Sequence, residues 1–439
     1  MSTEIDQSPL STLSKRIIFV VALAQGVALT LYYRALNEVW WPFEGDAITA
    51  TIGLLISWLP LLFVMTFRHT LWSRFYLIWL VGHVVLLVVA GTFWGSLSEA
   101  NALSITGGAR VLAFGVACFL CLVWMRACLH EQRWMPSYSA LCAFSSHSFS
   151  LLALGTLFGV LVLALCMLVG GLFAVIGIDA ISRFFREPEF VIPVWCLSFA
   201  SAAIWARSSV ASNLRSRLAL RAAFKFIVPP LALVTILFVA ALPFTGVAVI
   251  WDEGYGTATL LSFIFVTLFG LNAVLQDGDR VVYQGAVALL VRSLPLALTV
   301  LLALCVYGLF ERIAQYGLTF DRVVAVLMVA IAACFVVLYA VFVVPKPLSH
   351  LTALGRVNRA MSLVVLGVCL SLITPLIAWD KLIISQQLSR LSQDKVLAEQ
   401  FDYSYLVRLG DRGRAAVESL QTNTQYHQRH RPIDAAQRS

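Results

Sequence analysis

The sequence predicts an all-α polytopic membrane protein with about eleven transmembrane helices and a small C-terminal segment outside the membrane. Composition is the first reason, because 60% of the 439 residues are hydrophobic, 12% are charged and the mean hydropathy is +0.87. A soluble domain averages about 45–50% apolar and about 25% charged residues. The second reason is that the apolar residues form continuous runs, without the alternation that membrane barrel strands require.

Eleven apolar runs are long enough to span a bilayer, since a helix needs about 20 apolar residues to cross roughly 30 Å of hydrocarbon. They cover residues 17–36, 47–67, 71–92, 105–127, 149–175, 189–208, 223–244, 257–276, 286–310, 320–344 and 359–379. We therefore expect a helical bundle over residues 1–379. The first run lacks a small-residue cleavage site, which indicates a retained helix and not a removed signal peptide.

Basic residues predict the orientation, because cytoplasmic loops carry an excess of Lys and Arg. Fifteen fall in one set of alternate loops: Lys15, Arg16, Arg68, Arg74, Arg126, Arg133, Arg207, Arg215, Arg217, Arg221, Lys225, Arg280, Lys346, Arg356 and Arg359. The other set holds four: Arg183, Arg186, Arg312 and Arg322. This places the N-terminus in the cytoplasm. An odd number of spans then places the C-terminus on the periplasmic side, whereas one missed or split span would reverse it.

Two features of the bundle follow from local sequence. Residues 126–149 and 207–226 are long cytoplasmic stretches, which we expect to form helices lying on the inner membrane surface. The sequence GTLFG, Gly155 to Gly159, has the small-residue spacing that allows two membrane helices to approach closely. Neither feature indicates a substrate.

The composition changes after Trp379. Residues 380–420 combine an amphipathic helical pattern with an aromatic-rich stretch, so we expect a small folded segment outside the membrane. Residues 421–439 are polar and are predicted to be disordered. His427 and His430 in this tail are interpreted as solvated residues, with metal binding as the alternative.

Few ionisable or polar groups lie within the spans, where they are unfavourable and often functional. His83 is either a proton relay or a neutral histidine hydrogen-bonded inside the bundle. Arg110 either faces a cavity or an anionic ligand, or extends to the outer interface. Asn272 either lines a pore or joins two helices through a hydrogen bond. In each case the structural interpretation is the simpler one.

The sequence contains no established chemical motif. A P-loop, an HExxH zinc motif, a GxSxG elbow and a dinucleotide fingerprint are all missing, so we assign no catalytic, cofactor-binding or metal-binding residue. The net charge of +8 is explained by the basic cytoplasmic loops, which excludes nucleic acid as an expected partner. Nine cysteines lie in or beside apolar runs, which argues against a disulfide framework.

Two stretches carry a resemblance to a known family. They are RIAQYGLTFDRVVAVL, residues 312–327, and EQFDYSYLVRLGDRGRAAVESL, residues 399–420. They resemble a family of bacterial multi-pass inner-membrane proteins catalogued as domain of unknown function 4153. The matching positions are Tyr316, Gly317, Leu318, Thr319 and Arg322, then Phe401, Asp402, Tyr405, Leu406, Gly410 and Gly413. Asp411 and Arg412 stand where the family pattern has an Arg-Tyr pair. The resemblance implies a bacterial inner-membrane location and no activity, cofactor or substrate.

The first of these stretches has the features of a tight external turn between the ninth and tenth spans. Gly317 can take the left-handed conformation that ends a helix, and Thr319 can cap the next helix with Asp321 in its first turn. The turn itself does not require Tyr316 or Arg322. We therefore expect these two side chains to contact the C-terminal segment.

Three functions remain open on the sequence alone. A transport or channel-like protein is placed first, and a scaffold for envelope assembly or signalling, with a protein partner at the C-terminal segment, is the alternative. A lipid-linked glycosyl or similar transferase is third, because Glu38, Glu44 and Asp46 lie in the first external loop. An enzyme is the less favoured class, and the lipid bilayer is the one partner that the composition requires.

Overall fold

The computed structural model confirms an all-α polytopic membrane fold. It describes residues 10–38, 46–67, 74–95, 105–175, 178–208, 210–247, 249–252, 256–275, 283–344, 352–393, 395–397 and 400–422. Within these residues, eleven helices are long and apolar enough to cross a membrane. Each overlaps one of the eleven predicted runs, so the number and order of spans were predicted correctly.

The spanning helices are α1 (Thr12–Glu38), α2 (Asp46–Thr66), α3 (Arg74–Gly95), α5 (Ile105–Glu131), α6 (Tyr138–Val175), α8 (Pro188–Ser208), α9 (Val210–Thr245), α11 (Gly256–Leu275), α12 (Gly285–Tyr316), α13 (Phe320–Val343) and α14 (Thr352–Ile373). The shorter helices are α7 (Asp179–Phe184), α10 (Val249–Asp252), α15 (Trp379–Ser392), α16 (Tyr403–Arg408) and α17 (Asp411–Thr422).

The two expected surface helices are not separate elements. Residues 126–149 divide between the end of α5 and the beginning of α6, and residues 210–226 are the first part of α9. The physical reason is local: residues 210–228 contain no glycine or proline, so nothing ends the helix before the apolar run begins. Between α5 and α6, the side chain of Glu131 accepts a hydrogen bond from the backbone N–H of Ser137 at 2.8 Å.

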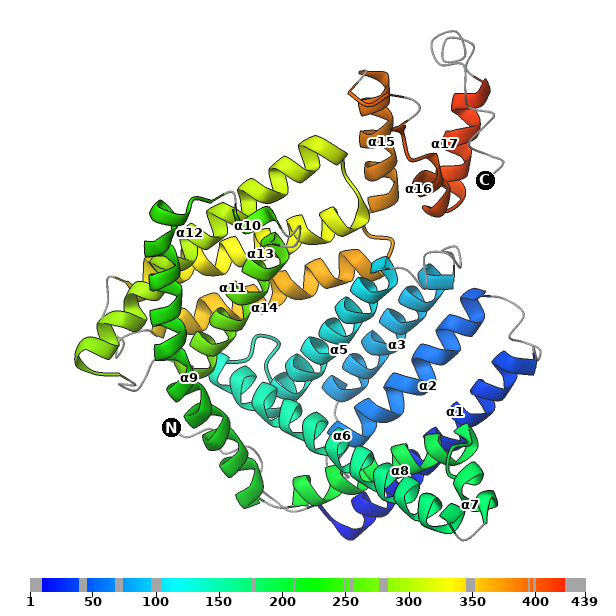
Figure 1. Ribbon diagram of the computed structural model, residues 1–439. Coiled ribbons are helices and arrows are strands. Elements are labelled where there is room, and N and C mark those ends of the chain that lie inside the picture. The colour runs from blue at the N-terminus through cyan, green and yellow to red at the C-terminus, as the bar shows by residue number, and fades with distance from the viewer. Residues whose placement is uncertain are drawn as a thin grey trace. The chain divides into compact units, whose positions relative to one another are not determined.

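The chain forms two compact units. The first unit holds residues 1–96 and 118–223, and the second holds residues 97–117 and 224–439, so the division falls within helices α5 and α9. In the first unit, α2 packs against α3, and α8 packs against both α1 and α6. In the second unit, α11, α12, α13 and α14 pack in sequence around one hydrophobic core (Figure 1).

The expected close-packing motif lies where α6 meets α8. A Cβ atom at Gly155 would lie 2.5 Å from the ring of Phe199, and one at Gly159 would lie 3.0 Å from the ring of Trp195. Hydrogen in place of a side chain therefore lets two aromatic residues of α8 lie directly on the backbone of α6. Gly171, on the same helix, faces open space.

Helices α15, α16 and α17 follow the last span and enclose a small core of their own (Figure 1). Its buried members are Ile384, Leu391, Phe401, Leu406 and Val417. The proposed boundary of this segment at residues 380 and 420 stays a prediction, and the tail from residue 423 lies outside the described residues.

The close contact of α6 and α8 generates a stability prediction. We expect Gly155→Ala to destabilise the first unit by about 1–3 kcal/mol, because the added methyl group overpacks against Phe199. Thermal unfolding in detergent should show a melting temperature lowered by roughly 2–4 °C per kcal/mol. Gly171→Ala is the matched control, and it should leave the melting temperature unchanged or slightly higher because alanine favours helix. Equal shifts for the two variants would contradict the role of close packing at Gly155.

Candidate functional site

The candidate site is the turn between α12 and α13, on which the C-terminal helices are docked. Helix α12 ends at Tyr316. The next residue, Gly317, has a φ of +78° in the left-handed region, and its N–H donates to the carbonyl of Ile313 at 2.9 Å. Helix α13 begins after Thr319, as expected. The Thr319 side chain makes no capping hydrogen bond, so its predicted role as a side-chain cap is wrong.

Arg390 of α15 caps the end of α12. Its Nη1 donates to the carbonyls of Ile313 at 3.0 Å and Ala314 at 2.7 Å, and its Nη2 donates to that of Gln315 at 2.8 Å. The last four carbonyls of a helix have no partner within the helix and carry the negative end of its dipole. A guanidinium group suits this helix end in two ways. Its several N–H donors in a fixed plane pair with the carbonyls, and its positive charge offsets the negative end of the dipole.

Burial makes this contact energetically important. Arg390 is only 7% exposed, and within the described part of the chain no carboxylate forms an ion pair with it. The end of α12 is therefore its principal source of negative potential. Removing the Arg390 side chain would take a charged donor away from these three carbonyls, and a hydrogen bond to a charged group contributes about 1.5–3 kcal/mol.

Two adjacent glutamines bind the next residue of the turn. The N–H of Leu318 donates to Oε1 of Gln386 at 2.9 Å, and Nε2 of Gln387 donates to the carbonyl of Leu318 at 2.8 Å. Both main-chain polar groups of one loop residue are thus paired with α15. A Cβ at position 317 would lie 2.8 Å from the Gln387 amide, so a larger residue there would displace the Gln387 side chain.

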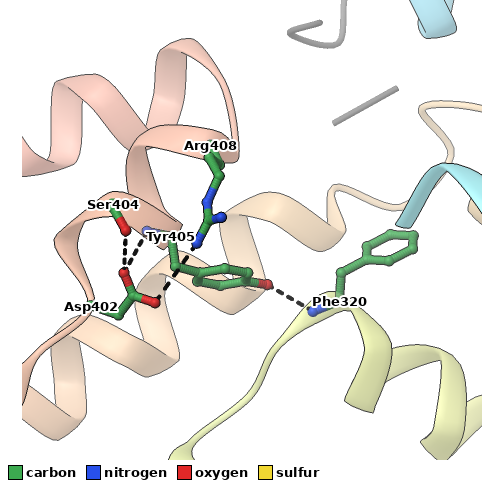
Figure 2. Close-up of polar contacts among 5 residues, drawn as sticks. All are labelled: Phe320, Asp402, Ser404, Tyr405 and Arg408. Carbon is green, nitrogen blue, oxygen red and sulfur yellow. Dashed lines mark hydrogen bonds and ion pairs between the residues drawn. The ribbon is translucent and has the colours of Figure 1, made fainter. Parts of the chain in front are cut away.

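Tyr405 of α16 completes the docking at the beginning of α13. The N–H of Phe320, one of the unpaired donors of the first helical turn, donates to the Tyr405 hydroxyl at 2.8 Å (Figure 2). Asp402 holds α16 in place by accepting from the N–H of Tyr405 at 2.9 Å and from the Ser404 hydroxyl at 2.6 Å (Figure 2). Burial raises the pKa of the Tyr405 hydroxyl above its ordinary value of 10.0, and this outweighs the opposing effects of the Phe320 N–H and the nearby arginines.

Two of the predicted residues, Arg322 and Tyr316, lie beside this contact. The Arg322 Nη1 donates to the Gly317 carbonyl at 2.6 Å, and its guanidinium lies 5.3 Å from the centre of the Tyr316 ring. Tyr316 itself is 58% exposed. The turn does contact the C-terminal segment, but the expectation that the Tyr316 side chain makes this contact is wrong. The docking side chains come from the C-terminal segment and bind the backbone of the turn.

Arg110, near the beginning of α5, belongs to the same region of the second unit. Its guanidinium lies 4.4 Å from the centre of the Phe320 ring, within the range of a cation–π interaction. It is also close enough to Asp380 and Tyr405 to interact with them electrostatically. The resulting neighbourhood joins α5, α13 and the C-terminal segment.

His83 and Asn272 have separate surroundings. His83 is buried in the first unit, where its Nδ1 lies 2.7 Å from the carbonyl of Trp79 on the same helix, so Nδ1 carries a proton and donates to that carbonyl. Asn272 accepts a hydrogen bond at 2.9 Å from Asn358, whose own oxygen accepts from Tyr339 at 3.3 Å. This chain of hydrogen bonds joins α11, α13 and α14 in the second unit, and it is the interhelical bonding expected as the alternative to a pore.

Sequence reasoning missed Gln386, Gln387 and Arg390. The available signal was their position on α15, because Gln387 and Arg390 share the apolar stripe formed by Ile383, Ile384 and Leu391. Polar residues within an apolar stripe indicate specific polar partners. Within the described residues, no three His, Cys, Asp or Glu side chains gather where they could hold a metal ion.

Comparison with known proteins identifies one family. The family model described as domain of unknown function (DUF4153) matches residues 61–420, which is most of the chain and includes both the turn and helices α15 to α17. Neither the curated proteins nor the solved structures contain a match to this chain.

The capping contact predicts that Arg390→Ala releases the C-terminal segment from the turn. The loss of a buried, charged hydrogen-bond donor corresponds to about 3 kcal/mol, and therefore to roughly 100-fold more frequent opening. Hydrogen exchange in detergent should accelerate by this factor at the amides of Leu318 and Phe320, which are bonded to Gln386 and Tyr405.

Arg412→Ala is the matched control for this experiment. Arg412 forms an exposed ion pair with Asp380 at 2.9 Å, and exposed pairs contribute about 0–1 kcal/mol. Its exchange rates should therefore change by less than about fivefold. Arg390→Lys keeps the charge but lacks the planar fork and should give an intermediate result. Unchanged exchange in Arg390→Ala would show that the cap does not hold the segment.

The buried Tyr405 hydroxyl predicts that docking weakens at high pH. Because burial raises the pKa of this group in the docked state, its contribution to stability is complete below the ordinary pKa of 10.0 and is lost as the pH rises above that value. Thermal unfolding of the wild type and of Tyr405→Phe, compared over a pH series, measures this contribution. The difference between their melting temperatures should be constant at lower pH and should shrink above pH 10.0. If the difference between the two melting temperatures does not change with pH, the predicted contribution of the Tyr405 hydroxyl is wrong.

Proposed function

We propose that this chain, which belongs to the family of the domain of unknown function DUF4153, is a membrane-embedded scaffold whose C-terminal helices α15 to α17 bind another protein. The observation that carries the proposal is the docking of α15 and α16 on the α12–α13 turn. Arg390, Gln386, Gln387 and Tyr405 all direct their polar groups to the backbone of that turn. Side chains committed in this way give the segment a defined position on the bundle.

The outward side of the segment supports an interaction role. Val407 of α16 is 40% exposed and Leu397, in the preceding loop, is 60% exposed. The residue after Val407, Arg408, is charged. Its guanidinium forms an exposed ion pair with Asp402 at 3.9 Å. Apolar side chains within a polar rim are typical of protein-binding surfaces, and a surface held in a fixed position binds with a smaller loss of conformational freedom.

We further propose that the protein lies in a bacterial inner membrane with α15 to α17 on the periplasmic side. The support is the distribution of fifteen basic residues against four in alternate loops, together with eleven spanning helices. The end of α12, the beginning of α13 and the end of α14 lie on the same side when consecutive spans alternate in direction. The docked segment belongs to that side.

Transport, the first expectation from the sequence, becomes the second candidate. Its residues His83, Arg110 and Asn272 have different partners, namely Trp79, Phe320 and Asn358. The polar chain through Asn272 and Asn358 is the observation that favours it. Substrate flux in proteoliposomes that is lost in Arg110→Ala or His83→Ala would place transport first again.

A lipid-linked transferase remains third. Glu38 ends α1 and Asp46 begins α2, while Glu44 lies outside the described residues. Retention of cellular function after Glu44→Gln and Asp46→Asn would exclude it.

A single cross-linking experiment tests both the scaffold and its orientation. Val407→Cys is introduced into the full chain, and intact spheroplasts are treated with a membrane-impermeant reagent that joins a thiol to nearby amines. We expect a discrete protein adduct, which weakens when Arg390→Ala is added because the surface is no longer held in place. The parent chain is the control, since its exposed Cys334 lies within the α13 span, where such a reagent does not reach.

The outcomes separate the two claims. Labelling of the Val407→Cys variant without a discrete adduct would contradict the scaffold but support the orientation. Absence of labelling in intact spheroplasts, with labelling after permeabilisation, would place the segment on the cytoplasmic side.

A further inference from the structure

The junction between α14 and α15 exposes apolar side chains beyond the end of a membrane span. The α14 span ends at Ile373, and α15 begins at Trp379. Leu376 and Ile377 in the connection are 72% and 43% exposed, and Leu382 in the first turn of α15 is 47% exposed. Three large apolar residues within seven positions, outside the span and uncovered by the fold, require an apolar environment.

The other side of α15 is already occupied. Ile383, Gln387 and Arg390 are buried on the side that docks the α12–α13 turn, and Ile384 and Leu391 belong to the core with α16 and α17. The remaining exposed positions on α15 are Lys381, Leu382, Ser385, Ser389 and Ser392. Along this exposed side the apolar character is confined to the first turn, and polar residues follow. This gradient is what a helix rising out of a bilayer surface should show.

The junction is also held close to the end of the span. Nε1 of Trp379 donates to the carbonyl of Ser371, in the last turn of α14, at 2.9 Å. Tryptophan with one apolar face and one polar edge is favoured at the membrane–water boundary, and lysine there keeps its charge at the headgroups while its stem lies among apolar groups. Lys381 is exposed beside Leu382 and can do this.

We propose that residues 375–382 form a lipid-interface anchor, which inserts Leu376, Ile377 and Leu382 among the lipids next to the end of the α14 span. The occupant is lipid because the exposed patch continues directly from a span that lipid already surrounds, separated from Ile373 by two residues. The anchor holds the base of α15 at the bilayer surface while Arg390 holds its other end on the turn. It does not depend on the scaffold proposal, because no partner protein enters it.

Photo-cross-linking in proteoliposomes tests the anchor directly. The photoreactive amino acid p-benzoylphenylalanine replaces Leu376 in the full chain, which is reconstituted in phosphatidylethanolamine and phosphatidylglycerol with a small fraction of alkyne-tagged phosphatidylethanolamine. Ser389 is the matched control, because it is exposed on α15, two turns beyond Leu382. Leu289, exposed within the α12 span, is the positive control.

We expect lipid adducts at position 376 to exceed those at position 389 by at least about tenfold, which is the ratio for transferring one leucine side chain from water into lipid. Equal adduct formation at 376 and 389 would overturn the proposal. An adduct at 376 with a second copy of this chain would also overturn it, because the patch would then be an interface between copies. Correct folding of each variant is verified by its melting temperature.

Discussion

The interaction on which the docked segment depends is the contact between the Arg390 guanidinium and the end of α12. Three carbonyls in the last turn of the helix receive donors from one buried side chain that is distant in sequence, and the carbonyl of Ile313 also accepts the N–H of Gly317. The guanidinium has no ion-pair partner within the described residues. The helix end therefore supplies the acceptors for the arginine, and the arginine supplies the donors for the helix end. Gln386, Gln387 and Tyr405 add hydrogen bonds to the turn next to this contact. Gly317 leaves room for the Gln387 side chain.

The same solution recurs at other helix ends of this chain. In the first unit, buried Arg207 of α8 donates to the carbonyl of Val64, in the last turn of α2, at 2.5 Å and to that of Phe67, directly after α2, at 2.7 Å. In the second unit, Arg292 of α12 donates to the carbonyl of Val344, after α13, at 2.6 Å. A membrane helix that ends near the hydrocarbon boundary has limited access to water, so a donor from a neighbouring helix is valuable. These arginines near the ends of spans therefore stabilise helix packing.

The two ends of α15 face different environments. Its C-terminal half directs Gln387 and Arg390 to the turn and Leu391 to the small core, while its first turn exposes Leu382 beside the end of α14. If lipid covers the first turn as proposed, the segment is fixed by polar contacts at one end and by lipid at the other, and its outward surface keeps a constant height above the membrane. A scaffold benefits from such a fixed surface, because a partner protein that binds it loses less conformational entropy than one that must first order it.

The sequence by itself determined the fold class, the eleven spans, the turn at Gly317 and the close packing at Gly155, because each depends on residues that are neighbours in the chain. Hydropathy accumulates over about 20 consecutive residues, and a left-handed turn or a small-residue spacing is a local property. It also indicated that the turn contacts the C-terminal segment, to which Arg322 is close enough to interact electrostatically with Tyr405, but it did not identify the side chains that bind the turn. Only the tertiary structure decided that Arg390, Gln386, Gln387 and Tyr405 make it, because they bind main-chain groups of the turn. Every residue has the same main-chain groups, so no pattern of side chains along the sequence identifies which of them a distant arginine will bind.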